Sequence, residues 1–116
     1  MVDEERMREL LASEREDAER LIASLSHGIA EVSEAREGDN SDDEHDPEGS
    51  TLAFERSQAA TLLEQSRVRL GEIAEAVTRL EEGRFGICVG CGRPIAPARL
   101  EIRPYAARCV DCAAGR

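Results

Sequence analysis

Aromatic residues are almost missing from this chain of 116 residues. Phe54, Phe85 and Tyr105 are the only ones, and there is no tryptophan. The hydrophobic content is 41%, but much of it is alanine, so we expect no large globular core. A chain of this length predicts one domain, or a small module with an extension.

Lysine is absent, and all 15 basic residues are arginine. The 25 acidic residues outnumber them and give a formal net charge of −10. Attraction to phosphates requires a positive surface, so this composition argues against non-specific DNA binding. A charged fraction of 34% suits long, solvated helices instead.

Long apolar runs are also absent. No segment approaches the roughly 20 residues that cross a bilayer, and the acidic start of the chain lacks the apolar stretch of a signal peptide. We therefore expect a cytoplasmic protein with no membrane partner. In a reducing cytosol, four cysteines in two close pairs indicate metal ligands rather than disulfides.

Two stretches carry the seven-residue apolar spacing of paired helices. The first, residues 3–35, has a stripe formed by Leu11, Ala18, Leu25 and Val32. The second, residues 51–82, has two interleaved series, which are Leu63, Leu70 and Val77, and Ala59, Ser66, Ile73 and Leu80. Together these series predict a helix seam that is interrupted only at Ser66.

The segment between the two stretches, residues 37–50, is predicted to be a loop. Half of its residues are acidic, and its Gly, Asn, Ser and Pro residues oppose a helix. Ser50 or Thr51 would cap the start of the second helix, and Gly83 would cap its end. The sequence thus predicts a mainly α fold, with a long antiparallel coiled-coil hairpin over residues 1–83 and an acidic tip.

The remaining segment, residues 84–116, carries the chemistry. Cys88 and Cys91 form one Cys-x-x-Cys pair, and Cys109 and Cys112 form another after a spacer of seventeen residues. Zinc prefers four tetrahedral ligands, and four thiolates leave no position open for water. We therefore predict a small four-cysteine zinc-finger module with one structural zinc ion, which a segment so poor in apolar residues needs in order to fold.

Gly90 and Gly92 suit a tight loop in which backbone N–H groups donate to the thiolates. Three alternatives for the cysteines stay open, namely a rubredoxin-like iron site, two disulfides, or a redox Cys-x-x-Cys pair. The shortage of aromatic residues argues against the first, and a redox pair needs a βαβ context that the sequence lacks. A RING-type ligase would have histidine among its ligands.

Four groups of residues resemble the DksA/TraR family. They are Gly83 to Cys88, Cys91 to Ile95, Arg99 to Pro104, and Cys109 to Cys112. The preceding helical hairpin also matches the layout of that family. The resemblance implies a C4-type zinc-finger transcription factor that binds bacterial RNA polymerase rather than DNA. Its hairpin would enter the secondary channel and modulate initiation, often together with guanosine tetraphosphate.

The resemblance also implies which residues would contact the polymerase. Acidic tip residues would approach the catalytic centre, while the zinc part would rest at the channel entrance. The candidates at the tip are Asp42, Asp43, Asp46 and Glu48. Arg99 and Arg103 are the candidates in the zinc segment.

This chain departs from the family pattern at two places. The Asp-x-x-Asp-x-Ala motif of the tip, when placed on Asp46, meets Gly49 and Thr51 at its later positions. Of three basic positions that hold the nucleotide in the family, Arg103 matches one, and Glu72 and Ala113 occupy the others. Because Glu72 would repel phosphates, we expect independence from guanosine tetraphosphate.

Two other classes of function stay open. Residues 84–116 contain six arginines but only two acidic residues, Glu101 and Asp111. This local excess of positive charge fits a zinc-ribbon DNA-binding protein, although the net charge of −10 for the whole chain opposes DNA binding. A coiled-coil assembly protein would pair its helices between chains, whereas a hairpin predicts a monomer. No nucleophile–base arrangement or open metal site is legible, so we expect no enzyme.

Overall fold

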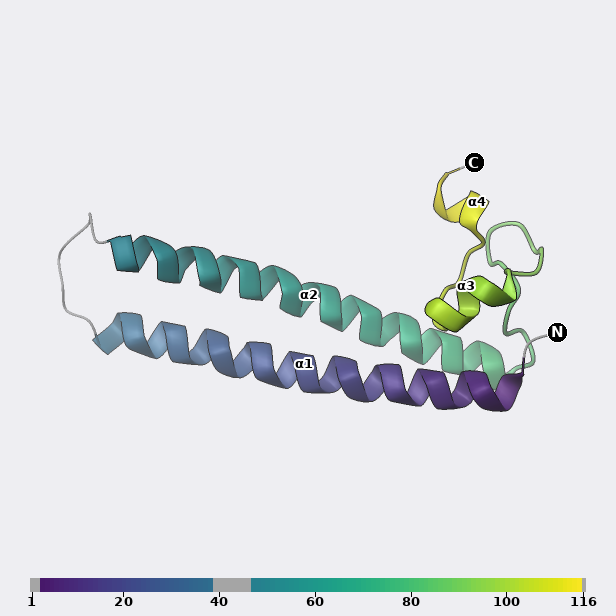
Figure 1. Ribbon diagram of the computed structural model, residues 1–116, viewed down its shortest axis with the longest axis horizontal. Helices are drawn as coiled ribbons and strands as arrows, with labels where there is room; N and C mark the ends of the chain where they lie inside the picture. The colour runs from purple at the N-terminus through teal and green to yellow at the C-terminus, as the bar shows by residue number, and fades with distance from the viewer. Residues whose placement is uncertain (1–2, 39–46, 116) are drawn as a thin grey trace. The chain divides into compact units, whose positions relative to one another are not determined.

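The computed structural model describes residues 3–38 and 47–115, with side chains placed for residues 3–28 and 51–115. Within these ranges the helices are α1 (Glu4–Gly38), α2 (Pro47–Glu81), α3 (Pro97–Ile102) and α4 (Val110–Ala113) (Figure 1). The same ranges contain no strand, only an isolated antiparallel bridge between Ile87 and Pro94. None of these helices has both the length and the apolar character that crossing a bilayer requires.

Helix α1 begins where the sequence supplies a cap. The carboxylate of Asp3 accepts hydrogen bonds from the backbone N–H groups of Glu5 and Arg6, at 3.1 and 3.3 Å. These N–H groups have no partner inside the helix, so the carboxylate satisfies them. Glu4 and Glu5 add negative charge to the first turn, where it interacts favourably with the positive end of the helix dipole.

The connection between the two long helices is shorter than predicted. Helix α1 continues to Gly38 and α2 begins at Pro47, so the prediction that Ser50 or Thr51 caps α2 is wrong. Proline opposes a helix only in its interior, because the first turn does not need its missing N–H and its fixed φ suits that position. The residues left between the helices, 39–46, lie outside the described residues.

The end of α2 follows the predicted cap. Gly83 has a φ of +74°, which a residue without a side chain adopts at little cost. The N–H of Gly83 donates to the carbonyl of Leu80, and the N–H of Arg84 donates to the carbonyl of Arg79 at 2.8 Å. This pair of hydrogen bonds is the Schellman arrangement, and it turns the chain from the helix into the cysteine segment.

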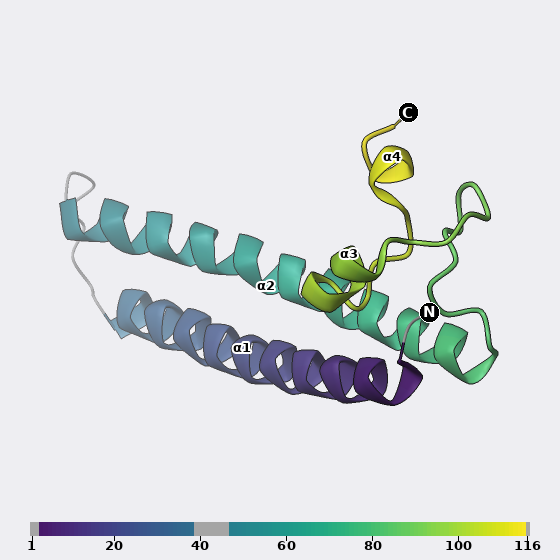
Figure 2. The same cartoon turned by 45° about the vertical axis from the view of Figure 1, so that its right-hand side comes forward.

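The chain forms two compact units, one of Met1–Asp17 and Arg69–Arg116 and the other of Ala18–Val68. In the first unit, the opening turns of α1 lie antiparallel beside the closing turns of α2, as Figures 1 and 2 both show. The buried apolar residues of these helix turns are Met7, Leu11, Ile73, Ala76 and Leu80. The predicted antiparallel helix pair is therefore confirmed, whereas a domain boundary at residues 83/84 stays a prediction.

The second unit contains the remaining parts of α1 and α2. Ala18 and Leu63 are buried there, as the heptad spacing predicts. Ser66, which interrupts the apolar seam in the sequence, is only 3% exposed. Its hydroxyl donates to the carbonyl of Leu62 at 2.9 Å, so burial does not leave the polar group unsatisfied.

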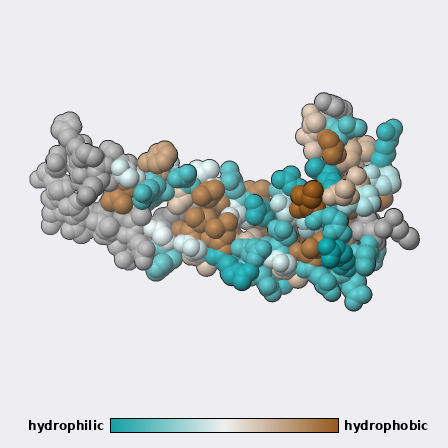
Figure 3. All heavy atoms as spheres, in the orientation of Figure 1, coloured by the Kyte–Doolittle hydropathy of each residue, from teal (hydrophilic) through white to brown (hydrophobic). Residues whose placement is uncertain are grey.

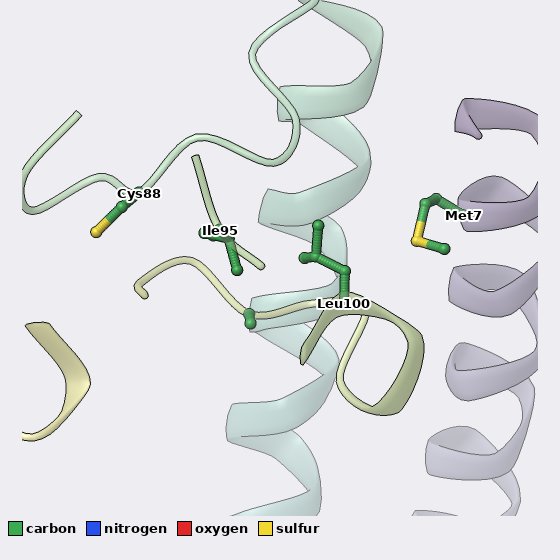
Figure 4. Packing of buried hydrophobic residues seen from close by; sticks show 5 residues of the cluster. Met7, Cys88, Ile95 and Leu100 are labelled. Carbon is green, nitrogen blue, oxygen red and sulfur yellow. The ribbon is translucent and has the colours of Figure 1, made fainter. Parts of the chain in front are cut away.

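A small hydrophobic cluster in the first unit joins the start of α1 to the cysteine segment. Its buried members are Met7, Cys88, Ile95, Leu100 and Ala106. Figure 4 shows Leu100 on α3, with Met7 on one side and Ile95 on the other. The cluster is small, which agrees with the shortage of large apolar residues in the sequence.

An ion pair supports this cluster at the surface. The guanidinium of Arg6 on α1 binds the carboxylate of Glu101 on α3, with Nε at 3.0 Å from Oε1 and Nη2 at 3.0 Å from Oε2. Both side chains are about half exposed, so the pair contributes orientation more than stability. The start of α1 and α3, which are far apart in the sequence, are thus held together by this ion pair and by the apolar cluster. Elsewhere, hydrophilic residues dominate the visible face, with apolar residues in separate groups (Figure 3).

Replacing Leu100 with alanine should destabilise the first unit by about 2–5 kcal/mol, because its side chain is fully buried. Thermal unfolding of the zinc-loaded chain, followed by circular dichroism, measures the loss. Ile102→Ala on the same helix is the matched control, since Ile102 is 84% exposed and should change stability by less than about 0.5 kcal/mol. Equal effects of the two substitutions would contradict the role given to the cluster.

Candidate metal centre

The first cysteine pair lies in a tight backbone loop that follows the end of α2. The N–H of Cys88 donates to the carbonyl of Arg93 at 2.8 Å, and the N–H of Gly92 donates to the carbonyl of Cys88 at 2.9 Å. The N–H of Gly90 donates to the sulfur of Cys88 at 3.3 Å. The predicted N–H donation to a thiolate is therefore confirmed for Gly90, whereas Gly92 supports the backbone and has a φ of +74°.

The second cysteine pair lies at the start of α4. Cys109 occupies the N-cap position, and its sulfur accepts a hydrogen bond from the N–H of Cys112 at 3.5 Å. The N–H of Val89 donates to the carbonyl of Ala107 at 2.9 Å, which holds the two loops against each other. Each loop thus presents two sulfur atoms toward the other loop.

The four sulfur atoms form one compact group. Those of Cys88, Cys91, Cys109 and Cys112 all lie within 4.8 Å of one another. A tetrahedral site with Zn–S bonds of about 2.3 Å has sulfur atoms about 3.8 Å apart. The sulfurs of Cys91 and Cys109 are 3.8 Å apart. The residues present therefore fit one tetrahedral metal ion with four thiolate ligands.

The same geometry tests two of the alternatives. All four cysteines are free, so the hypothesis of two disulfides is wrong. Four sulfurs at tetrahedral spacing suit zinc or iron, because both accept a tetrahedral thiolate set. The choice between these metals comes from the comparison with known proteins.

Crowding of the sulfurs changes their acidity. Backbone N–H groups, foremost that of Cys109, lower the pKa of Cys88 to about 6, although burial acts in the opposite direction. Neighbouring thiols, foremost Cys88, raise the pKa of Cys112 to about 12. Four thiolates repel one another, so a divalent cation shared among them removes the cost of ionising the last one.

Two charged residues line the hollow beside the less buried cysteines. Arg93 and Asp111 border it together with Cys91, Cys109 and Cys112. Asp111 lies in the first turn of α4, and Arg93 follows the first loop. These two side chains carry charges of opposite sign, so together they add little net charge at the open side of the metal site.

The other predicted site residues fall into two groups. Arg99 is half-buried, and its Nε donates to the carbonyl of Arg108 at 3.0 Å, so it braces the segment that leads into the second cysteine pair. Arg103 is exposed, and its guanidinium lies 5.6 Å from the ring centroid of Tyr105. Asp42, Asp43 and Asp46 of the predicted tip lie outside the described residues.

Glu48 stands in the first turn of α2, and its side chain is outside the described part. Glu72 on α2 and Ala113 on α4 are both exposed. The described residues thus bring the four cysteines together and place two of the predicted arginines in the same unit.

Sequence reasoning did not single out Arg108, whose guanidinium lies close to the cysteine loops. Its position directly before Cys109 is the only sequence signal that could have indicated it. It also did not place Met7 in the same apolar cluster as Cys88, because no local spacing connects the start of α1 to the cysteines.

The sequences of curated proteins provide an independent comparison. General stress protein 16O of Bacillus subtilis is 30% identical over 108 residues, which are 93% of this chain and 60% of that protein. RNA polymerase-binding transcription factor DksA of Caulobacter vibrioides is 40% identical over 48 residues, which are 41% of this chain and 34% of that protein. The matches to both relatives thus cover less than two thirds of the relatives' own length.

A solved structure and a family description complete the comparison. The structure of transcription factor DksA2 from Pseudomonas aeruginosa matches with a TM-score of 0.76 at 25% identity, covering 97% of this chain and 81% of that chain. Residues 83–116 match the family described as Prokaryotic dksA/traR C4-type zinc finger. That match selects zinc for the four cysteines. The cysteine segment thus matches the DksA/TraR C4-type zinc finger, and the fold of the chain, including the helices that precede this segment, is similar to that of DksA2.

Proposed function

We propose that this chain is a transcription regulator that binds RNA polymerase through the secondary channel and modulates initiation. The observation that carries the proposal is the likeness to transcription factor DksA2 over 97% of the chain. It includes both the antiparallel helices and the cysteine segment. Curated relatives named RNA polymerase-binding transcription factor support the choice of partner.

Each part of the chain has a separate task in this proposal. The helical hairpin, residues 1–83, enters the channel, and the tip acids Asp42, Asp43, Asp46 and Glu48 approach the catalytic centre. The zinc module, residues 84–116, contacts the rim of the channel. Four thiolates complete the coordination of the zinc ion, so it serves the fold of the module and no catalysis.

Arg103 is the better placed of the two proposed arginine contacts. It is exposed, and its guanidinium lies over the ring of Tyr105 within the range of a cation–π contact. Arg99 is half-buried and already donates within the module, so it offers a partner fewer free N–H groups. Glu72 and Ala113 supply no positive charge for a nucleotide, so we propose that the activity does not require guanosine tetraphosphate.

The helix pairing favours a chain that acts as a monomer in the cytoplasm, where bacterial RNA polymerase works. Ile73 and Leu80 are buried within one chain, so the apolar seam is already covered without a second copy. This burial argues against an assembly protein whose helices pair between chains.

The tagged chain should retain RNA polymerase core enzyme in a pull-down. A second factor known to occupy the secondary channel should displace it, because two proteins cannot fill one channel. The comparison runs at fixed salt with increasing competitor. Retention that stays constant at saturating competitor would place the binding site elsewhere on the polymerase.

The DNA-binding alternative predicts a different result from the same protein. A zinc ribbon that neutralises phosphates should shift duplex DNA in a gel at low salt, and this binding should weaken steeply at moderate salt. With a net charge of −10, we expect no shift at either salt concentration. A salt-sensitive shift without polymerase would favour the DNA-binding function over the polymerase-binding one.

A further inference from the structure

Gly90 borders a space that two other side chains already fill. A Cβ atom on this glycine would lie 3.1 Å from the sulfur of Cys112 and 3.1 Å from Nη1 of Arg108. Contacts that close are rare for real Cβ atoms, so a larger residue would force one of the two neighbours to move. The missing side chain at Gly90 therefore allows the Arg108 guanidinium and the Cys112 sulfur to share one side of the loop.

The backbone that carries Arg108 is held in place from α3. Arg99 donates from its Nε to the carbonyl of Arg108 at 3.0 Å. Next to it, the carbonyl of Ala107 accepts from the N–H of Val89 in the first cysteine loop at 2.9 Å. These two hydrogen bonds on neighbouring carbonyls fix the approach of Arg108 to the cysteine site.

The sulfur of Cys112 lacks the support that two of the other sulfurs have. Backbone N–H groups donate to Cys88 and to Cys109. Within the described ranges, no N–H group donates to the sulfur of Cys112. A divalent ion with four thiolates carries a net charge of −2, so positive groups beside the sulfurs stabilise the loaded site.

We propose that Arg108 holds the metal through Cys112, by placing its positive charge beside that thiolate in the space left by Gly90. This role concerns the retention of zinc and is independent of the proposed polymerase partner. Arg93 and Asp111 line the open side of the site with opposite charges, so they leave little net compensation there. Arg108 therefore supplies the excess positive charge next to the cluster.

The test measures zinc affinity of the full chain by competition with a chromogenic chelator. Arg108→Gln should weaken affinity by about tenfold, the lower end for residues that support metal ligands. Arg108→Lys, which keeps the charge, should recover most of the loss. The difference between the parent and Arg108→Gln should shrink at about 1 M salt, where the screening length falls to about 3 Å.

Arg103→Gln is the matched control, because it removes the same charge from the same module, while the Arg103 guanidinium lies over the ring of Tyr105. Its zinc affinity should equal that of the parent. Equal losses for Arg103→Gln and Arg108→Gln would overturn the proposal in favour of a general effect of module charge. A loss in Arg108→Gln that lysine does not recover and salt does not change would also overturn it, since packing alone would explain that result.

Discussion

Replacing Cys109 with serine should remove zinc from the chain and unfold residues 84–116 locally. Cys109 is one of the four clustered thiols and the N-cap of α4. Serine is also a good N-cap, so this substitution keeps the start of the short helix and deletes only the thiolate. A serine hydroxyl does not ionise near neutral pH, and three thiolates cannot complete the tetrahedral site.

The expected loss is large because the module has little else to hold it. Structural zinc contributes about 10–16 kcal/mol of binding free energy in isolated zinc fingers. The apolar cluster around Leu100 is small by comparison, and Cys88 is itself one of its members. The Met7 end of α1 should therefore loosen together with the module, because Met7 packs in that cluster.

The second unit should survive the same substitution. Its buried residues, including Ala18 and Leu63, lie on α1 and α2 and belong to no part of the zinc site. Metal analysis measures the zinc content, and amide hydrogen exchange locates the unfolding. Protection should vanish over residues 84–113 and persist over much of residues 18–28 and 51–68.

Val110→Ser is the matched control for this experiment. It introduces serine at the next position, where the side chain is 59% exposed and no ligand is lost. Its zinc content and exchange pattern should match those of the parent. Stoichiometric zinc in Cys109→Ser, with protection of the module, would remove Cys109 from the ligand set.

The metal site was predictable because its ligands come from two local motifs. Each Cys-x-x-Cys pair fixes two sulfurs on one loop, and the spacer only has to bring the loops together. The cap at Gly83 was predictable for the same reason, since it depends on the residues that directly follow the helix. Features encoded within a few residues were thus legible in the sequence.

Contacts between segments far apart in the chain could not be predicted from the sequence. Met7 belongs to the same apolar cluster as Cys88 and Leu100, and Arg6 binds Glu101, but neither arrangement has a sequence signature. The prediction for the start of α2 failed for a different reason. It assumed that glycine and proline oppose a helix at every position, although Pro47 would do so only in the interior of a helix.

The sequence predicted the spacing of the apolar positions along the two helices, but not how deeply each of them is buried. Leu70 and Val77 occupy predicted seam positions and are only half-buried. Arg79, a charged residue outside the predicted series, is 7% exposed. Burial lowers the pKa of its guanidinium while Glu75 acts against that shift. An apolar stem allows arginine to enter such a seam, which a pattern of apolar letters does not capture.

Replacing Asp42, Asp43, Asp46 and Glu48 with Asn or Gln should abolish most of the proposed effect on open-complex lifetime. The polymerase catalytic centre holds Mg²⁺ on carboxylates, so a carboxylate-bearing tip brought near it can perturb the metal and the nucleic acid. Neutral amides of the same size would lose that influence. Asp46, which directly precedes the first residue of α2, is our first choice for the dominant acid.

The same variant should keep its zinc and much of its affinity for polymerase. None of its changes falls in the cysteine cluster or among the buried residues of the described part. The proposed contacts of the helices and the module also remain. Binding to polymerase should therefore weaken only modestly. The experiment then distinguishes the effect on open-complex lifetime from occupancy of the channel.

A matched variant removes the same charge from exposed helix positions. Its four substitutions to Gln are at Glu9, Glu16, Glu55 and Glu64. Both variants lower the negative charge of the chain equally, so any effect of net charge on polymerase association appears in both. Only the tip variant should lose the effect on open complexes, measured as their lifetime in transcription assays at saturating protein.

The competing explanation is that the acidic segment is only a solvated turn. Half of the residues in 37–50 are acidic on a chain that already carries a charge of −10, which exceeds what solubility requires. If the tip variant shortens or lengthens open-complex lifetime as the parent does, the acids have no part in the mechanism. The protein would then act by occupying the channel, and the determinant of its effect would be the length and packing of α1 and α2 rather than the charge between them.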